Sequence, residues 1–400
     1  MSRILLTWEL GLNLGHLARL LPVASRLRER GHAVLVAARD LAAAARVLQP
    51  GGISFVQAPH LTRGHPLPHR AAGYSDILRA QGWGDRTTLA GLTEGWINLY
   101  RMFRPDIVVA DYSPTATLAA HLTHVPCLLV GNGFELPPAT APLPPFPGFS
   151  WATPERAADS EALVVENANA VARACGGTGV TSLCELINAR RALFATFPEL
   201  DHYGQRDGAQ YIGPLLGQFA TTPSEWPAGR GLRIFAYVRP DTRNVQSLLA
   251  ALVAREARVV CVAAGFSSAQ LRPFRRDSIR FSAFPVDLQP LLNADLCITY
   301  GAEGTMMNFI MSGVPQLISP WHVEAYMAAR RIEAAGLGLT ADNVTVARSV
   351  EASIGRLIAD PSVKQAVKAF ARHAATTQNL RSADAVVDAL HALLQIGVAH

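Results

Sequence analysis

The stretch ADLCITYGAEGTMMNFIMSGVPQLISPWHVEAYMAARRIEAAGLG, residues 294–338, decides how the second half of the chain folds. An apolar run ends at Thr299, and a turn of small residues leads from Gly301 to Thr305 and into a helical pattern. Glycine lets a backbone approach a phosphate closely, and the free amides and dipole of a helix start favour an anion. The stretch therefore predicts a phosphate-binding turn, although an ordinary strand-to-helix turn contains the same glycines.

Outward from this stretch, short apolar runs alternate with helical patterns along both halves of the chain. The first half contains ILLTW, a helix expected from His16 to Arg30, AVLVAA, PDIVVADYS, the helix TATLAAHLTH and VPCLLVGN. The second half contains LRIFAYV, the helix NVQSLLAALVAR, ARVVCVAAG, SIRFSAF and ADLCITYG. The strands are continuous apolar runs, which is typical of parallel sheets covered on both faces. We therefore predict an α/β protein with two Rossmann-like domains facing each other across a cleft.

Two segments interrupt this alternation. PPATAPLPPFPG, residues 137–148, contains too many prolines for a helix or a central strand and predicts an extended loop, with helical segments following to about residue 193. GQFATTPSEWPAGRG, residues 217–231, predicts the linker between the domains. We expect an N-terminal domain over 1–216, a C-terminal domain over 217–380, and a last helix within 381–400 that needs a surface on which to pack.

Composition excludes several classes of protein. The chain has 400 residues, of which 50% are hydrophobic, so two domains can each bury a core. The net charge of +5 comes from arginines that are scattered along the chain, which argues against nucleic acid as a partner. No apolar run approaches the roughly 18 residues of a membrane span, and no secretory signal is recognisable. We expect a cytoplasmic protein that is a monomer or a homodimer.

The five cysteines do not form a disulfide or zinc-binding pattern, because their number is odd and none has CxxC spacing. Cys127, Cys261 and Cys297 lie in apolar runs and are expected to be reduced core residues. No other cluster has the spacing of metal ligands. The sequence therefore predicts neither a metal site nor a cofactor.

Two motifs match a known family in order and spacing. From Ala294 to Ile332 the chain has ADLCITYG, EGT, SGVP, SP, an acidic residue and a pair of arginines, and near its start it has GHLARLLPVASRLRERGHAV. It resembles the family 1 glycosyltransferases of the GT-B fold, which include bacterial macrolide and flavonoid glycosyltransferases. The resemblance implies an inverting transfer of a sugar from a nucleoside diphosphate, UDP or dTDP, to a hydroxyl of a small, largely apolar acceptor.

The resemblance gives roles to residues that would bind the donor diphosphate. Gly301, Gly304 and Thr305 match the turn and helix start that hold the phosphates. Tyr300 stands where the family usually has a histidine, and its hydroxyl can donate a hydrogen bond but supplies no charge. Arg239 follows the run LRIFAYV, near a phosphate-contacting position of the family. Its guanidinium could replace the missing charge, although a solvated loop arginine is an equally simple interpretation.

Other residues would bind the base and the sugar of the donor. Glu324 matches the family's acidic residue that binds sugar hydroxyls, whereas Ala325 replaces a glutamine that often follows it. One sugar contact is therefore missing, which argues against glucose. FPVDLQPLL resembles the segment that reads the nucleotide base near Val286. Phe284 is a candidate for stacking on the base, although a core phenylalanine at a strand end is the more common interpretation of such a residue.

A base is needed to remove the proton of the acceptor hydroxyl, and a histidine titrates in the suitable pH range. His16 matches the family's catalytic histidine, with Arg19 in place of a proline. Asp111 matches the aspartate that orients this histidine and stabilises the imidazolium as it forms. Each residue alone has a simpler interpretation: His16 as a helix-initiating residue, and Asp111 as a helix N-cap beside Ser113.

Two further ionisable groups remain without a settled role. Glu9 lies in the same loop as His16 and is a rival for the base or a ligand for a sugar hydroxyl. His322, beside Trp321, lies in the donor segment and has no assigned role. Two other functions also stay open: a non-catalytic protein that binds a sugar nucleotide or activates a partner, and a sugar-nucleotide epimerase of the same fold.

Overall fold

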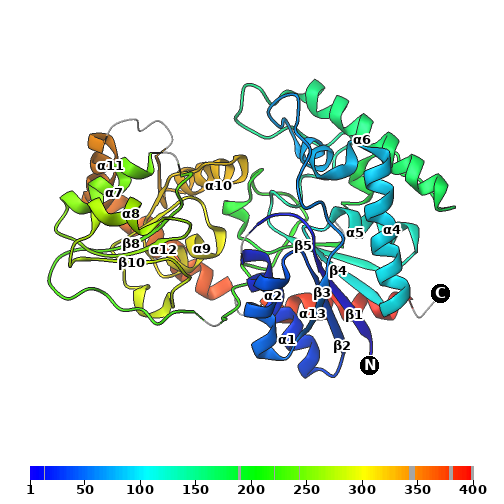
Figure 1. The fold of residues 1–400 in the computed structure, drawn as a ribbon, viewed down its shortest axis with the longest axis horizontal. Coiled ribbons are helices and arrows are strands. Elements are labelled where there is room, and N and C mark those ends of the chain that lie inside the picture. Colours follow the sequence, from blue (N-terminus) through cyan, green and yellow to red (C-terminus); the bar gives the residue numbers. More distant parts are fainter. Residues whose placement is uncertain are drawn as a thin grey trace. The chain divides into compact units, whose positions relative to one another are not determined.

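The computed structural model describes residues 1–12, 14–187, 191–219, 221–242, 244–341, 347–377 and 382–397. The chain folds into two compact units, each of which is described by itself below (Figure 1). The first unit holds the described residues of Met1–Pro198, Gln205–Phe219 and Leu380–His400, and the second holds those of Glu199–Gly204 and Ala220–Asn379.

In the described part of the first unit, a sheet of parallel strands has the order β3-β2-β1-β4-β5-β6-β7. The strands are β1 (Arg3–Trp8), β2 (Ala33–Ala38), β3 (Ser54–Gln57), β4 (Ile107–Asp111), β5 (Cys127–Gly131), β6 (Ala192–Phe194) and β7 (Gln210–Tyr211). The helices are α1 (Gly15–Glu29), α2 (Leu41–Leu48), α3 (Tyr74–Leu78), α4 (Arg86–Phe103), α5 (Pro114–Leu122), α6 (Pro154–Ala174) and α13 (Ser382–Gly397).

Alternate residues of β1 face two different cores. Ile4 and Leu6 pack with residues of α1, α2 and α13, whereas Leu5 packs with residues of α4 and α5. A strand covered on both faces needs apolar residues at consecutive positions, because neighbouring side chains point to opposite sides of the sheet. This explains the continuous apolar run in the sequence, and it confirms the predicted α/β architecture of this half.

The second unit repeats the arrangement with the parallel strand order β10-β9-β8-β11-β12-β13. Its strands are β8 (Arg233–Val238), β9 (Arg258–Ala263), β10 (Ile279–Ser282), β11 (Leu296–Thr299), β12 (Gln316–Ile318) and β13 (Gly338–Thr340). Its helices are α7 (Val245–Ala254), α8 (Ser268–Leu271), α9 (Glu303–Met311), α10 (Val323–Ala334), α11 (Ala347–Ala359) and α12 (Pro361–Thr377). Helices α7 and α11 cover one face of the sheet, and α9 packs on the other.

The division between the units lies within the linker expected over 217–231, but a few residues beyond the expected boundary at 216. Gly217 stays with the first unit because its N–H donates a hydrogen bond to the carbonyl of Ala18 in α1. The short segment Glu199–Gly204 belongs to the second unit. There the guanidinium of Arg331 donates two hydrogen bonds to the carbonyl of Glu199. The proline-rich residues 137–148 form no helix or strand, as predicted.

The last helix, α13, packs in the first unit beside α1, after the chain has passed through the whole second unit (Figure 1). Val387 and Leu390 are fully buried in the core that α1 also covers. At the edge of this contact, Arg26 donates from Nε to Asp384 Oδ1 at 2.6 Å. Of the segment expected over 381–400, residues 381 and 398–400 lie outside the described part.

The buried apolar residues of each unit form the cores on the two faces of its sheet. Cys261 and Cys297 are buried and unpaired, as predicted, while Cys127 is half-buried. Among the described residues, no helix is both long enough and apolar enough to span a bilayer.

Replacing Leu390 by alanine tests the packing of α13. The side chain is fully buried, so the loss of its methyl groups should lower the unfolding free energy of the first unit by about 2–5 kcal/mol. Calorimetric or denaturant unfolding measures this change. Gln395→Ala, at an exposed position of the same helix, is the matched control and should cost less than about 0.5 kcal/mol. Equal stability of both variants would show that α13 does not pack on this core in solution.

Candidate active site

The structure brings His16 and Asp111 together at the carboxyl edge of the first sheet. Asp111 is the last residue of β4, and the parallel register pairs it with Trp8, the last residue of β1. His16 lies in the first turn of α1, and its Nδ1 is 3.0 Å from Asp111 Oδ1. The imidazole stacks between Trp8 and Tyr112, at ring-centroid distances of 5.5 and 5.9 Å. Carboxyl ends of neighbouring parallel strands meet at one edge, which agrees with the pairing that the family resemblance implied.

Arg19 and Glu135 complete a buried charge cluster with these two residues. Arg19 lies one turn after His16 on α1, and its Nη1 donates to Asp111 Oδ1 at 2.7 Å and to Glu135 Oε2 at 2.5 Å. Glu135 follows β5, and its Oε1 lies 3.7 Å from His16 Nδ1. None of the four residues, His16, Arg19, Asp111 and Glu135, is more than 8% exposed. Arg19 stands where the family has a proline, and no sequence motif pointed to Glu135.

The cluster determines the protonation of His16. Burial disfavours the charged imidazolium, but the charge and hydrogen bond of Asp111 and the charge of Glu135 outweigh it, so the pKa of His16 is raised. A proton on Nδ1 is donated to Asp111, which leaves Nε2 as the atom that exchanges a proton. Gly11 lies beside this nitrogen: its φ is +83°, and a Cβ there would lie 2.2 Å from Nε2. Only glycine fits this position of the loop.

In the structure, the carboxylate of Glu9 contacts the start of α5. Its Oε2 accepts hydrogen bonds from the N–H groups of Thr115, at 2.9 Å, and Ala116, at 3.4 Å. The buried carboxylate thus caps the start of α5, where the helix dipole favours a negative charge. The N-cap interpretation of Asp111 is therefore wrong, because Glu9 takes the capping role and Asp111 lies in the strand. Burial nevertheless raises the pKa of Glu9 to about 7.

A pocket opens beside the charge cluster in the first unit. Glu135 and Tyr112 contribute to its wall, and most of the other residues are apolar or aromatic. It lies at the carboxyl ends of β4 and β5, the edge where α/β folds commonly bind ligands. The remaining residues of the wall are Tyr74, Leu78, Trp83, Ala110, Ser113, Pro114, Thr117, Leu129, Leu136, Leu183, Leu186 and Ile187.

In the second unit, the turn after β11 has the geometry that the sequence predicted. Gly301 adopts φ +106°, and a Cβ on it would lie 2.4 Å from the Cβ of Ala325 in α10. A Cβ on Gly304, in the first turn of α9, would meet no atom within 4 Å, so the helix start is open on that side. Thr305 follows in the same turn. This is a tight glycine turn that leads into an accessible helix N-terminus.

Tyr300 and Arg239 lie together at the carboxyl ends of neighbouring strands. Strands β8 and β11 pair in parallel with Tyr237 opposite Thr299, so the residues that follow them are close. The ring of Tyr300 meets that of Tyr237 edge-on at a centroid distance of 5.0 Å, and the side chain of Arg239 lies beside its hydroxyl. Burial raises the pKa of Tyr300, which keeps the phenol neutral. Arg239 brings a positive charge to the edge where the glycine turn begins, and its Nε donates a hydrogen bond to Asp241 Oδ1 at 3.4 Å.

Phe284 and Val286 differ in exposure. Phe284 is 62% exposed, so its interpretation as a core residue is wrong; it precedes Pro285 in a loop after β10 and packs into no described core. Val286 is buried and forms an isolated parallel bridge with Thr222. The bridge uses the carbonyl of Pro285 and the N–H of Asp287. The N–H of Val286 itself therefore points to the other side of the chain.

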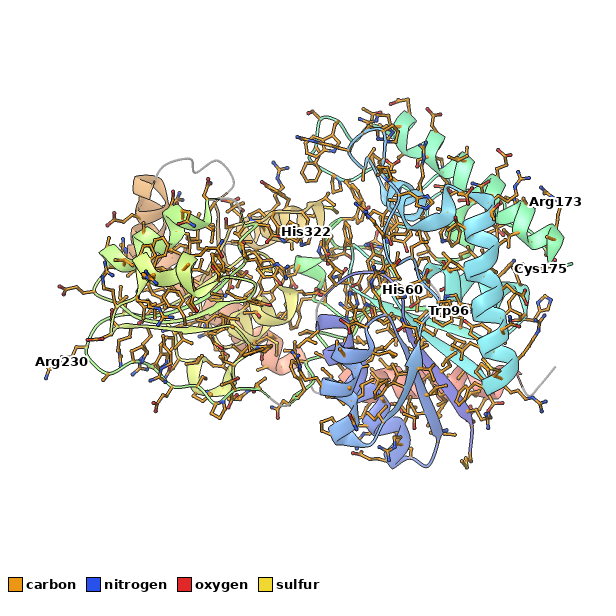
Figure 2. The ribbon with its side chains drawn as sticks, in the orientation of Figure 1. His60, Trp96, Arg173, Cys175, Arg230 and His322 are labelled. Carbon is orange, nitrogen blue, oxygen red and sulfur yellow. The ribbon has the colours of Figure 1, made fainter. Side chains whose placement is uncertain are left out.

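His322, labelled in Figure 2, is the N-cap of α10. Its Nδ1 accepts a hydrogen bond from the N–H of Ala325 at 3.4 Å. Burial lowers the pKa of His322 to about 4, so the side chain is neutral near pH 7 and can act as this acceptor. Glu324, in the first turn of the helix, has Oε2 at 4.0 Å from the same nitrogen. The two residues thus lie together, and His322 has a capping role.

Solved structures with this architecture are glycosyltransferases. The spinosyn rhamnosyltransferase SpnG matches with a TM-score of 0.69 at 18% identity, over 98% of this chain and 100% of that chain. VinC, solved in complex with dTDP, matches with 0.71 at 20%, over 98% and 99%. The glycotransferase of kitacinnamycin matches with 0.71 at 19%, over 97% and 99%. The chain has the GT-B fold.

Curated sequences that resemble this chain are also glycosyltransferases. PGL/p-HBAD biosynthesis rhamnosyltransferases of Mycobacterium bovis and Mycobacterium tuberculosis are 24% identical to this chain over 306 residues. The match covers 68% of this chain and 66% of the relatives, just under two thirds of their length. No protein-family model matches the chain. The predicted fold is confirmed, and the matched structures cover nearly the whole chain, including the middle region in which no sequence motif was found.

The raised pKa of Glu9 makes the stability of the first GT-B unit depend on pH. The unfolded carboxyl titrates near 4.5 and the folded one near 7, so protonation stabilises the folded state, and this contribution is lost as pH rises through 7. Glu9→Gln cannot titrate. The wild type should therefore lose about 3 kcal/mol relative to this variant between pH 4.5 and pH 8, as measured by denaturant unfolding. Glu166→Gln, at an exposed position, is the control; a difference between wild type and Glu9→Gln that does not vary with pH would contradict the assignment.

Proposed function

We propose that this chain is an inverting glycosyltransferase that moves a sugar from a nucleoside diphosphate, UDP or dTDP, to a hydroxyl of a small, largely apolar acceptor. The buried His16–Asp111 pair at the edge of the first sheet is the observation that carries the proposal. The GT-B fold and the glycosyltransferases that share it support the same reaction class.

In the proposed mechanism, His16 is the general base. Asp111 accepts a hydrogen bond from the Nδ1–H group at 3.0 Å and so directs the lone pair of Nε2 towards the acceptor hydroxyl. Nε2 takes the hydroxyl proton as the acceptor oxygen forms its bond to the anomeric carbon. The bond from that carbon to the diphosphate breaks on the opposite face, which inverts the configuration. Asp111 stabilises the imidazolium that results, and such a base contributes about 10²–10⁴-fold to the rate.

The donor diphosphate would bind in the second unit at the turn from Gly301 to Thr305. The amides and dipole of α9 suit an anion, and Arg239 adds the charge that Tyr300 lacks. We propose that no metal ion is needed. In the first unit, Arg19 Nη1 already lies between the carboxylates of Asp111 and Glu135, where a cation would otherwise bind. Glu324 would bind sugar hydroxyls, and Phe284, being exposed, is available to stack on the base.

The apolar wall of the pocket beside Tyr112 and Glu135 supports a largely apolar acceptor. One matched structure contains SpnG with the spinosyn aglycone, and others contain thymidine diphosphate. The curated relatives are rhamnosyltransferases. Ala325, in place of a sugar-binding glutamine, agrees with a donor sugar that offers fewer hydroxyls. A dTDP-linked 6-deoxyhexose such as rhamnose is therefore the first donor to test.

The same substitutions at Tyr300 and Ala325 favour one second candidate, a non-catalytic protein that binds the sugar nucleotide. In that case the charge cluster around His16 would have only a structural role. Turnover by the wild type separates the two functions, because both predict donor binding and only the first predicts transfer or slow hydrolysis of the donor. An epimerase would instead change the configuration of the sugar without transferring it.

His16→Ala tests the base assignment. Transfer from dTDP-rhamnose or UDP-glucose to a panel of polyketide and flavonoid alcohols, with EDTA present throughout, should fall about 10²–10⁴-fold in kcat/KM. The Kd for dTDP, measured by calorimetry, should stay within about twofold, because the nucleotide binds in the other unit. His373→Ala, an exposed histidine of α12, is the control. Equal turnover by His16→Ala would overturn the assignment, and a strict requirement for Mg²⁺ would contradict metal independence.

Arg239→Met tests the proposed replacement of charge in the donor site. Loss of a charged hydrogen-bond donor should weaken dTDP binding about 10–100-fold, with a shallower dependence on salt. Arg230→Met is the matched control, because Arg230 projects from the outer side of the second unit (Figure 2) and is exposed. Equal affinities of the two variants would show that Arg239 is a solvated loop arginine.

A further inference from the structure

His16 faces two carboxylates, although an orienting role needs only one. Its Nδ1 lies 3.0 Å from Asp111 Oδ1 and 3.7 Å from Glu135 Oε1. Both carboxylates are almost fully buried, so water screens them little. Two uncompensated negative charges at this distance would hold the imidazole in its protonated form. A histidine that keeps its proton cannot take one from an acceptor hydroxyl.

Arg19 compensates one of these two negative charges. One of its nitrogens, Nη1, contacts Asp111 Oδ1 at 2.7 Å and Glu135 Oε2 at 2.5 Å. Two carboxylates and one guanidinium have a net charge of −1, which is the charge of Asp111 alone. The arginine is itself buried, and a buried guanidinium is costly unless it is paired, so Arg19 needs Glu135 as much as the carboxylates need Arg19.

Arg19 also fixes the position of Asp111. Oδ1 of this carboxylate accepts both the His16 and the Arg19 contacts, whereas Oδ2 is buried without a hydrogen-bond partner among the described residues. On the other side of the bridge, Glu135 Oε2 also accepts the N–H of Asn132 at 2.8 Å, which anchors it to the end of β5. The guanidinium thus ties together α1, the end of β4 and the loop after β5.

Among the described residues of the first unit, no further charged group faces the imidazole. Its two faces are covered by Trp8 and Tyr112, and the backbone of Gly11 lies beside Nε2. The charged groups that face His16 are therefore Asp111 from β4, Glu135 from the loop after β5 and Arg19 from α1, with Tyr112 as the neighbouring titratable group.

We propose that Arg19 and Glu135 act as a matched pair of positioning residues, which fixes Asp111 and leaves His16 facing the net charge of a single carboxylate. The placement of the charges stands on the contacts alone. Its consequence for catalysis rests on the proposed function, in which His16 is the base. Neither residue needs to touch a substrate for this role.

The test is a set of NMR titrations of His16 in the intact protein labelled with ¹³C-histidine, with His16→Asn used to assign the signal. Arg19→Met leaves two carboxylates and should raise the pKa of His16, by about one unit or more. Glu135→Gln leaves Asp111 balanced by Arg19 and should lower it by a similar amount. The double variant restores a single carboxylate and should return to within about half a unit of the wild type.

A merely structural pair would give a different result. Loss of packing would lower stability in each variant but would not shift the titration of His16 in opposite directions. Shifts of the same sign in the two single variants, a double variant whose pKa stays well away from the wild-type value, or no shift would overturn the proposal. Where Arg19→Met does not fold, Glu135→Gln and Arg19→Lys decide: the first must lower the pKa of His16, and the second must leave it nearly unchanged.

The titration needs no turnover, so it can succeed or fail independently of the proposed glycosyl transfer. Where transfer is observed, the acidic limb of the kcat/KM profile should move with the NMR value in each variant. If the acidic limb of the kcat/KM profile stays fixed while the pKa of His16 measured by NMR moves, the role of Arg19 and Glu135 is supported and His16 is not the base.

Discussion

A carboxylate with no exposure to solvent, that of Asp111, constrains most of what surrounds it in the first unit. A buried charge needs partners that are placed accurately, since its desolvation costs several kcal/mol. The parallel register of β1 and β4 fixes where the carboxylate lies, and the loop after β1 must then deliver His16 and Arg19 to the same oxygen. This requirement explains the first two turns of α1, in which a histidine and an arginine three residues apart face inward. It also explains Gly11, because a side chain there would collide with the imidazole.

In the second unit, too, neighbouring parallel strands bring two polar side chains together at their carboxyl ends. Strands β8 and β11 end side by side, so Arg239 and Tyr300 are neighbours although they lie far apart in the sequence. The glycine turn approaches α10 so closely that Ala325 fills the space beside Gly301. A glutamine at 325 would place a longer side chain at this contact. Ala325, which packs against the turn, is therefore also the residue that stands in place of the family's sugar-binding glutamine.

Periodicity and the edge rule were sufficient for the fold, whereas the pairing of His16 with Asp111 was implied by the resemblance to the glycosyltransferases. Each apolar run became a parallel strand, and the ends of adjacent strands had to meet. Glu135 could not be found in this way, because its role depends on a contact with Arg19, 116 residues away in the sequence, across a loop without a recognisable motif. Glu9 and Phe284 show the same limit. Glu9 caps α5 and Phe284 is exposed because of the direction in which each side chain points, and an apolar pattern does not predict that direction.

Both departures from the family pattern that involve charge have a compensating residue within the same unit. Tyr300 cannot carry charge, and Arg239 contacts it; Arg19 replaces a proline, and Glu135 balances it. A set of four buried ionisable groups is rarely the most stable way to fill a core, because apolar residues of similar volume avoid the desolvation cost. A protein that only bound a sugar nucleotide in its second unit would gain nothing from such a cluster in the first. The cluster is therefore easier to explain by proton transfer at His16 than by stability, and this favours a catalytic protein over a non-catalytic binder.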